Sequence, residues 1–207
     1  MLALTGISAV SGQVYQQVAR IPGADQDAAL TALSGWAPKV LRYRFLRILG
    51  SFTDDERQRL LSILDSPAMR AAREAEAVAL EQQNSDHYLA YQQRLNTQPP
   101  SETRLAMVAE LDRSMKFSEW LLRVDTAIAG ATHSAADSDR VKKEAMGFLL
   151  FAYRYTSPAD MQTLISHWQT PVMQDWLAAA TAALPVSSDS TETPDRSGHL
   201  DAPAPTE

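Results

Sequence analysis

The sequence contains no cysteine, and this absence excludes disulfide bonds, thiolate metal sites and a cysteine nucleophile. Glycine is scarce as well, with 8 residues in 207, and no glycine-rich loop of the kind that cradles phosphates occurs. No apolar run approaches the roughly 20 residues that a membrane-spanning helix needs. We therefore expect no membrane span and no common type of nucleotide site. The lack of cysteine does not decide the compartment, because cytosolic and exported bacterial proteins can both lack it.

Residues that bind metals or carry out catalysis are few and scattered. No two of the four histidines share an i, i+4 spacing, and no H-E-x-x-H or G-x-S-x-G motif occurs. The carboxylates of Asp54, Asp55 and Glu56 lie at the start of a predicted helix, where they stabilise the helix dipole. The sequence thus predicts no catalytic residue, no metal ligand and no cofactor. Residues that converge only in space are invisible in a sequence, so a hydrolase with an unrecognised site stays an alternative.

The net charge of −6 is unevenly distributed. Residues 185–207 contain five acidic residues and one arginine, which gives this segment −4 and leaves −2 for the rest. Nucleic-acid binding needs an excess of Lys and Arg, so we expect no nucleic-acid partner. The segment is also rich in Ser, Thr, Pro and Asp and poor in apolar residues. We predict a disordered acidic tail over 186–207.

The rest of the composition favours helices packed around a core. Apolar residues make up 45% of the chain, and residues with high helix propensity are abundant. Apolar positions recur at spacings of three and four between capping residues and Pro or Gly breakers. The segment 145–153 is apolar all round, which predicts a helix buried on every side. The sequence predicts an all-α protein of roughly eight to ten helices, over 2–20, 25–35, 39–49, 53–66, 67–95, 102–115, 117–130, 145–153, 157–170 and 171–184.

These helices fall into two halves. A linker over 96–102, NTQPPSE, separates a first helical half, 1–95, from a second helical half, 103–185. Within the first half we expect one long helix over 67–95, because no Pro or Gly interrupts it. The predicted fold is a multi-helix bundle built from two related helical halves, with the acidic tail behind it.

Two stretches, FTDDERQRLLSILDSPAM (52–69) and TSPADMQTLISHWQTPVM (156–173), match at a spacing of 104 residues. Any two capped helices look partly alike, but here the matches fall at the caps, the apolar stripe and the proline breaks. We favour a duplicated helical unit. The matched motif consists of Thr53, Glu56, Ser66, Pro67 and Met69 in the first copy and Ser157, Asp160, Thr170, Pro171 and Met173 in the second.

We interpret this repeated motif as structural. The hydroxyls of Ser66 and Thr170 each precede a new helix, so each is expected to accept a hydrogen bond from an amide two or three residues on. Met69 and Met173 are expected to point inward from the first turn of that helix. The six methionines between 69 and 173 are expected to belong to the ordinary core rather than to an adaptable groove. We expect no ligand to touch the motif.

The first copy also resembles the signature of a bacterial domain-of-unknown-function family of small, usually exported, all-helical proteins. The residues that fit the signature are Phe52, Thr53, Glu56, Ser66 and Pro67, and Thr156, Ser157, Asp160, Thr170 and Pro171 fit it more loosely. The chain departs from it at Met69 and Met173, where the family has Gly, and at Leu64, near an aromatic position that Trp168 fills in the second copy. The resemblance implies a periplasmic or otherwise exported protein and no particular activity. The start MLALTGISAV lacks a signal peptide's charged segment, so a cytoplasmic location is the alternative.

One cluster of basic residues, Lys39, Arg42, Arg44 and Arg47, surrounds Tyr43. Such a helix can hold an anionic group or an acidic partner, but we favour a solvated face whose Arg side chains cover nearby apolar surface. We expect a non-enzymatic, envelope-associated helical protein that binds an unidentified protein partner or an apolar ligand. The alternatives are an accessory or scaffold protein that acts through its acidic tail, and the unrecognised hydrolase. The sequence does not determine the oligomeric state.

Overall fold

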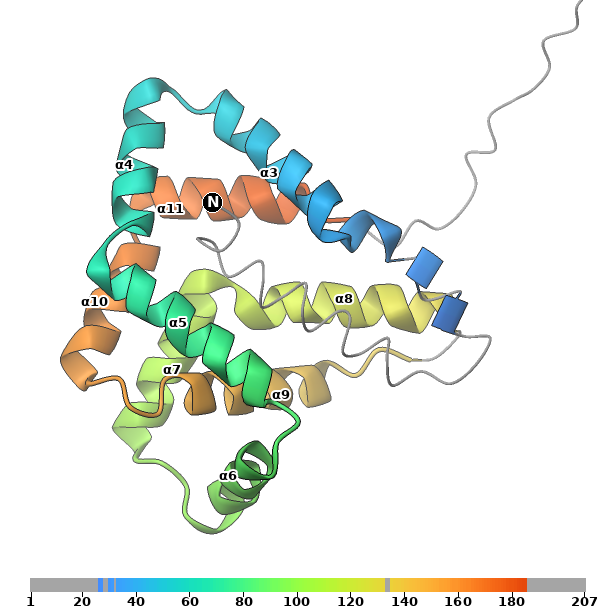
Figure 1. Ribbon diagram of the computed structural model, residues 1–207, viewed down its shortest axis with the longest axis vertical. Coiled ribbons are helices and arrows are strands. Elements are labelled where there is room, and N and C mark those ends of the chain that lie inside the picture. Colours follow the sequence, from blue (N-terminus) through green and yellow to red (C-terminus); the bar gives the residue numbers. More distant parts are fainter. Residues whose placement is uncertain (1–25, 28–29, 32, 133–134, 186–207) are drawn as a thin grey trace, which may run out of the picture.

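The computed structural model describes residues 26–27, 30–31, 33–132 and 135–185 (Figure 1). The helix expected over 2–20 and the predicted tail over 186–207 lie outside these residues. The described part contains nine α-helices and one short 3-10 helix and has no β-strand, which confirms the all-α fold class. The elements are η2 (Ser34–Trp36), α3 (Pro38–Ser51), α4 (Asp54–Leu64), α5 (Pro67–Gln82), α6 (Asp86–Thr97), α7 (Glu102–Met115), α8 (Phe117–Ala131), α9 (Ser138–Ala152), α10 (Pro158–Trp168) and α11 (Pro171–Ala182).

The prediction of one long helix over 67–95 is wrong. The chain forms two helices there, and α6 turns away from α5 at the bottom of Figure 1. Ser85 separates them, because its side chain accepts a hydrogen bond from the backbone N–H of Tyr88 at 3.2 Å. A serine that caps a new helix provides an alternative to continuing the old one. The predicted linker is also shorter than expected, since α6 continues to Thr97.

The prediction that the segment 145–153 is buried on every side is confirmed for nearly all of its residues. Ala145, Gly147 and every residue from Phe148 to Tyr153 are buried, and only Met146 is half-buried. Helix α9 contacts α5, α6, α7 and α8, so it lies at the centre of the bundle. Its apolar surface on all sides follows from having neighbours on all sides.

Helix boundaries recur at the predicted spacing. Helices α4 and α10 both contain 11 residues and begin 104 positions apart, and α5 and α11 both begin with a proline of the matched motif. Contacts between the two sets are reciprocal: α5 packs on α9 and α10, and α11 packs on α3 and α4. Reciprocal contacts are what a pseudo-twofold arrangement produces. The duplication itself stays a prediction, which superposition of 40–80 on 143–184 would test.

The two predicted halves share one hydrophobic core rather than forming separate lobes. An aromatic cluster joins α3, α8 and α11: the ring of Phe45 stacks 6.1 Å from Trp120 and lies 5.9 Å from Trp176. The indole N–H of Trp120 donates to the hydroxyl of Thr181 at 2.9 Å. Buried aromatic pairs of this kind contribute beyond the area they bury. The interface between the halves is therefore filled with side chains.

Candidate functional site

The exposed face of α3 carries most of the predicted basic cluster. Five exposed side chains follow one another at helical spacings of three, one, three and one, so they share one face. Two of them are large apolar or aromatic side chains that are nevertheless exposed: Tyr43 is 64% and Leu46 is 44% exposed. Helix α3 contains no acidic residue. We call this face the cationic stripe; it consists of Lys39, Arg42, Tyr43, Leu46 and Arg47.

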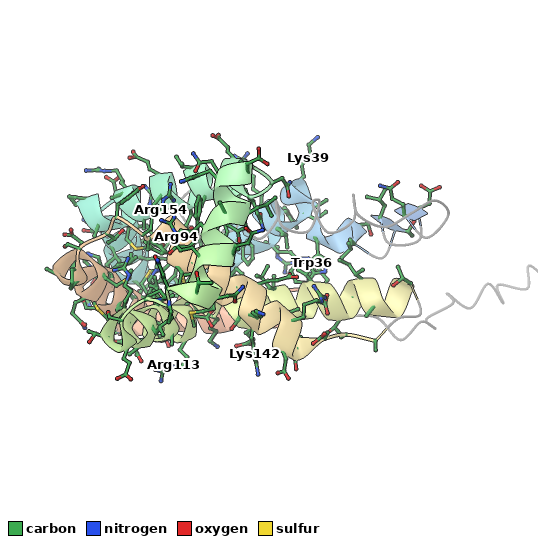
Figure 2. All side chains as sticks on the ribbon, turned by 90° about the horizontal axis from the view of Figure 1, so that it is seen from below. Trp36, Lys39, Arg94, Arg113, Lys142 and Arg154 are labelled. Carbon is green, nitrogen blue, oxygen red and sulfur yellow. The ribbon has the colours of Figure 1, made fainter. Side chains whose placement is uncertain are left out.

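The cations of the stripe lack the carboxylate partners that several other arginines have. Salt bridges are formed by Arg57, Arg70, Arg113, Arg123 and Arg140. Within the described part of the chain, none of the three cations of the stripe forms a salt bridge. Figure 2 shows Lys39 pointing away from the body of the protein. The stripe therefore presents positive charge that no side chain of the described residues neutralises by a salt bridge.

Arg44 belongs to a different environment from the rest of the predicted cluster. It is half-buried, and its guanidinium Nη1 donates to the carbonyl oxygen of Ala183 at 2.7 Å. Ala183 follows the last turn of α11, where carbonyls lack helical partners and a cation is favourable. The structure thus separates Arg44, which holds α11 against α3, from the three cations that face solvent.

The first copy of the repeated motif forms as predicted. Thr53 and Glu56 make a capping box: the Thr53 hydroxyl accepts from the Glu56 amide, and the Glu56 carboxylate accepts from the Thr53 amide at 2.8 Å. The bond from the Thr53 amide, and a second bond that the Thr53 hydroxyl donates to the same carboxylate oxygen, lower the pKa of the Glu56 carboxyl because they favour its ionised form. Ser66 accepts from the amide of Met69 at 3.3 Å, and Met69 is buried. The predicted caps at Thr53 and Ser66 and the inward position of Met69 are confirmed.

The second copy follows the prediction only in part. Ser157 accepts from the amide of Asp160 at 3.1 Å, and Met173 is fully buried, as expected. The prediction that the Thr170 hydroxyl accepts from a following amide is wrong. It instead donates to the carbonyl of His167 at 2.8 Å, at the end of α10. The hydroxyl therefore completes the preceding helix and leaves the next one without a side-chain cap.

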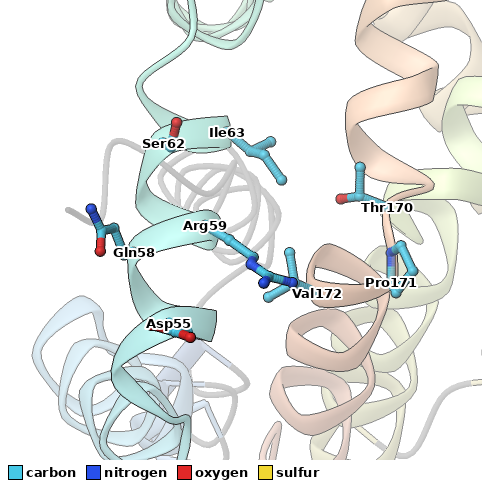
Figure 3. A pocket seen from close by; sticks show the side chains of 8 residues that line it. All are labelled: Asp55, Gln58, Arg59, Ser62, Ile63, Thr170, Pro171 and Val172. Carbon is cyan, nitrogen blue, oxygen red and sulfur yellow. The ribbon is translucent and has the colours of Figure 1, made fainter.

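A surface groove of about 690 Å³ separates α4 from the start of α11 (Figure 3). Figure 3 shows Arg59 reaching across it from α4 toward Val172. Thr170 and Pro171 of the second motif copy lie on its wall, and the expectation that no ligand touches the motif stays a prediction. The residues that line the groove are Asp55, Gln58, Arg59, Ser62, Ile63, Thr170, Pro171 and Val172.

A second groove, of about 470 Å³, runs between α6 and α9. Helix α6 approaches α9 closely there, because the Gln92 amide donates to the carbonyl of Gly147 at 3.1 Å. The groove walls mix aliphatic and amide side chains, with Lys143 as the one charged residue among its lining residues. Neither groove contains a convergent set of titratable groups that would perform acid–base chemistry.

A buried acidic residue joins the two halves. The Tyr153 hydroxyl of α9 donates to the carboxylate of Glu76 on α5 at 2.5 Å, and both side chains are buried. Desolvation raises the pKa of Glu76 to about 7, against the hydrogen bond from Tyr153 and the charge of Arg73, which both lower it. Burial and the adjoining carboxylate raise the pKa of Tyr153. Neither residue lines either of the two grooves described above.

Glu76 was not among the predicted residues, although the sequence contains a signal for it. The buried positions of α5 are Met69, Ala72, Glu76 and Ala79, which recur at spacings of three and four. This periodicity places Glu76 on the apolar face of the helix, where an unpaired carboxylate is costly. The tyrosine that accompanies it lies 77 positions away, so its identity could not be read from local spacing.

No group of three or more His, Asp or Glu side chains in the described part of the chain could hold a metal ion. His87 is exposed and lies against the edge of Phe151, whereas His167 is half-buried in the last turn of α10. His133 and His199 lie outside the described residues. None of the described helices combines the length and the apolar character that a bilayer crossing requires.

Comparison of the chain with protein-family models, with curated proteins and with solved structures finds no match. The resemblance of the repeated motif to a family of exported helical proteins therefore stays a prediction. A function can therefore be inferred only from the surface of this chain.

Proposed function

We propose that this protein is a non-enzymatic binding protein that docks an acidic segment of a protein partner on the cationic stripe. The observation that supports this proposal most directly is the unneutralised charge of the stripe, in which exposed Tyr43 and Leu46 lie between the cations. Arginine and tyrosine are the side chains that most often dominate protein–protein interfaces. A partner with carboxylates and an apolar residue on one face would complement both features.

The charge of the whole protein favours a protein partner over nucleic acid or an anionic membrane. The chain has a net charge of −6, so its overall field repels polyanions. Three exposed cations neutralise too few phosphates for strong nucleic-acid binding. A short acidic segment meets the local positive charge without bringing a large negative surface close to the body.

The stripe is small, and the affinity we expect is correspondingly modest. The eight residues of rise from Lys39 to Arg47 correspond to about 12 Å of helix. An interface of this length lies at the low end of the size range and is typical of transient contacts, with a Kd in the micromolar range or weaker. Long-range attraction between opposite charges would mainly accelerate association and would weaken with salt.

The test uses a fluorescein-labelled synthetic peptide composed of Glu, Leu and Ala, with Glu at i, i+4 spacing, and follows its fluorescence anisotropy. We expect the double variant Arg42→Glu/Arg47→Glu to bind this peptide at least about tenfold more weakly than the wild type, because two attractions become repulsions. The matched control is Lys142→Glu/Lys143→Glu, which makes the same charge change on exposed positions of α9. It should bind like the wild type.

Two results would contradict the proposal. Equal losses in the stripe variant and the control would mean that only net charge matters. Stripe-dependent binding to vesicles of anionic phospholipid, without binding to the peptide, would assign the stripe to a membrane surface instead. Both measurements need a salt series, since screening of exposed charges is nearly complete beyond about 10 Å at 0.1 M ionic strength.

The location of the protein is a separate part of the proposal. The resemblance of the motif around Phe52 and Ser66 implies an envelope protein, and we propose a periplasmic or otherwise exported location on that basis alone. Fractionation of the producing cells, with immunodetection of the chain in each fraction, tests it. Detection only in the cytoplasmic fraction would favour the alternative.

A further inference from the structure

The described chain ends beside α3. A Cβ added at Gly35, just before α3, would lie 2.9 Å from Cγ of Pro185, so these two residues are in close contact. The carbonyl of Ala183 accepts from Arg44 in the middle of α3. Figure 1 shows α3 crossing α11 in this region. The last 22 residues of the chain, 186–207, therefore start from a point fixed against the helix that carries the cationic stripe.

This terminal segment and α3 carry opposite charge. Helix α3 has four basic residues and no acidic residue. Residues 186–207 contain a single basic residue, Arg196, and five carboxylates, at Asp189, Glu192, Asp195, Asp201 and Glu207. The first carboxylate follows Pro185 by four positions. Helix α3 thus has a net positive charge, and the segment that follows Pro185 has a net negative charge.

We infer that residues 186–207 dock on the cationic stripe through their carboxylates and compete with the acidic segment of a partner. This inference rests on the proposed function, since it names the regulation of the same surface. The tail is an intramolecular ligand that resembles the partner in charge. It sets a threshold that only a partner with better complementarity to Tyr43 and Leu46 overcomes.

The length of the segment suits this role. The random-coil relation gives a root-mean-square span of about 26 Å for 22 residues, and the stripe is about 12 Å long. Tethering at such a distance produces an effective concentration in the millimolar range. Contacts that are weak individually are then occupied for much of the time, and they are screened by salt.

The direct test is carbodiimide cross-linking of the full chain, which joins a lysine amine to a nearby carboxylate. Four lysines are present, at 39, 116, 142 and 143. We expect peptide mapping of the monomer to show Lys39 joined to carboxylates of 186–207 at low salt. These products should be lost in Arg42→Glu/Arg47→Glu and at 0.5 M NaCl, while Lys142→Glu/Lys143→Glu keeps them. Products that persist in the stripe variant would show tethering without docking and would overturn the inference.

A binding experiment separates this inference from the proposed function. The full-length variant Asp189→Asn/Glu192→Gln/Asp195→Asn/Asp201→Asn removes four carboxylates without changing the chain length. We expect it to bind the labelled Glu-Leu-Ala peptide about three- to tenfold more tightly than the wild type, as the loss of a millimolar competitor implies. Equal, stripe-dependent binding by both chains would overturn the tail inference and leave the proposed function standing. If neither chain binds the peptide, the proposed function fails, and the cross-linking pattern decides the tail on its own.

Discussion

The helices α3, α4 and α5 and the helices α9, α10 and α11 have similar boundaries but different surroundings. Helix α9 is enclosed by α5, α6, α7 and α8, whereas the principal contacts of α3 in the described part are with η2 and α11. Helix α10 is also covered by α7, and Ile165 is buried there, while Leu61, its match in α4, is exposed. One pattern of caps and apolar residues thus forms the centre of the bundle in one place and its surface in another.

This difference shows that the repeated motif determines where its helices begin and end but not how deeply they are buried. Pro67 and Pro171 start a helix in both copies, because each supplies a fixed backbone angle and lacks the amide that a first turn leaves unbonded. Depth depends on which other helices cover the unit. The functional surface that we propose lies on the copy that is less covered.

The largest expected effect comes from a matched pair of leucines, 103 positions apart, on α3 and α9. Leu149 is 0% and Leu46 44% exposed. We expect Leu149→Ala to lower the free energy of unfolding by about 2–5 kcal/mol, because a buried side chain leaves a cavity. Leu46→Ala should change it by no more than about 0.5 kcal/mol. Urea denaturation measures both, and similar losses would mean that the face of α3 is covered.

The next effect concerns Glu76, the buried acidic residue of the first copy. At the matching position of the second copy, 104 residues on, the chain has Ala180. The pKa of Glu76 is about 7 in the folded protein and 4.5 ordinarily. The folded state therefore holds this proton more tightly than the unfolded chain does. The contribution of this protonated carboxyl to the free energy of unfolding is fully present below about pH 4.5 and is lost as the pH rises toward about 7. At about 1.4 kcal/mol per pKa unit, the loss is on the order of 3 kcal/mol.

Glu76→Gln keeps the shape of the side chain and removes its titration. We expect the difference in unfolding free energy between the wild type and this variant to change by roughly 3 kcal/mol between pH 4.5 and 7, with the wild type losing stability. Chemical denaturation at a series of pH values measures this difference and cancels the groups that both chains share. A difference that is flat with pH would contradict the burial of an ionisable Glu76.

A smaller effect separates the two proline corners. Ser66→Ala should cost about 0.5–2 kcal/mol, because the amide of Met69 loses its cap. Thr170→Ala should cost less, about 0.5–1 kcal/mol, because the carbonyl of His167 also accepts from the Thr170 amide and keeps that partner. Thermal unfolding of both variants, with Thr170→Ser as the control that restores the hydroxyl, checks the order. A larger loss of stability in Thr170→Ala than in Ser66→Ala would mean that the Thr170 hydroxyl caps α11, as the sequence predicted.

The smallest effect concerns two helical glycines. A Cβ added at Gly50 of α3 meets no atom within 4 Å, so Gly50→Ala should stabilise the protein by about 0.5–1 kcal/mol through helix propensity. A Cβ at Gly147 of α9 would lie 2.5 Å from Oε1 of Gln92. The flexible amide can turn away, but it then loses its bond to the Gly147 carbonyl, which offsets the gain. Differential scanning calorimetry should place the Gly50 variant above the Gly147 variant.

Much of the fold could be predicted from short-range pattern. The capping pair Thr53 and Glu56, the prolines at 67 and 171 and the apolar run of α9 act within one or two helical turns. The break at Ser85 was equally local and was overlooked, because it contains neither Pro nor Gly. Interactions within a helix are fixed by spacing, so a sequence reveals them.

The basic cluster was also visible in the sequence, but its division was not. Arg42 and Arg44 stand two positions apart, on different faces of α3, and only the packing of α11 makes Arg44 a ligand of Ala183. Likewise, the hydroxyl of Thr170 could donate to the carbonyl of a preceding residue or accept from the amide of a following one, and it donates to His167. Both alternatives satisfy local chemistry, and the tertiary environment selected one.

The sequence by itself determined that this protein is helical, where most of its helices begin, and that its charge is divided between a basic helix and an acidic end. Only the tertiary structure decided that α9 is enclosed while α3 is open, that Glu76 meets Tyr153, and that Pro185 lies against Gly35 at the start of α3. The physical reason is range. Helix formation and capping depend on residues a few positions apart, whereas burial and charge pairing depend on side chains that only the folded chain brings together.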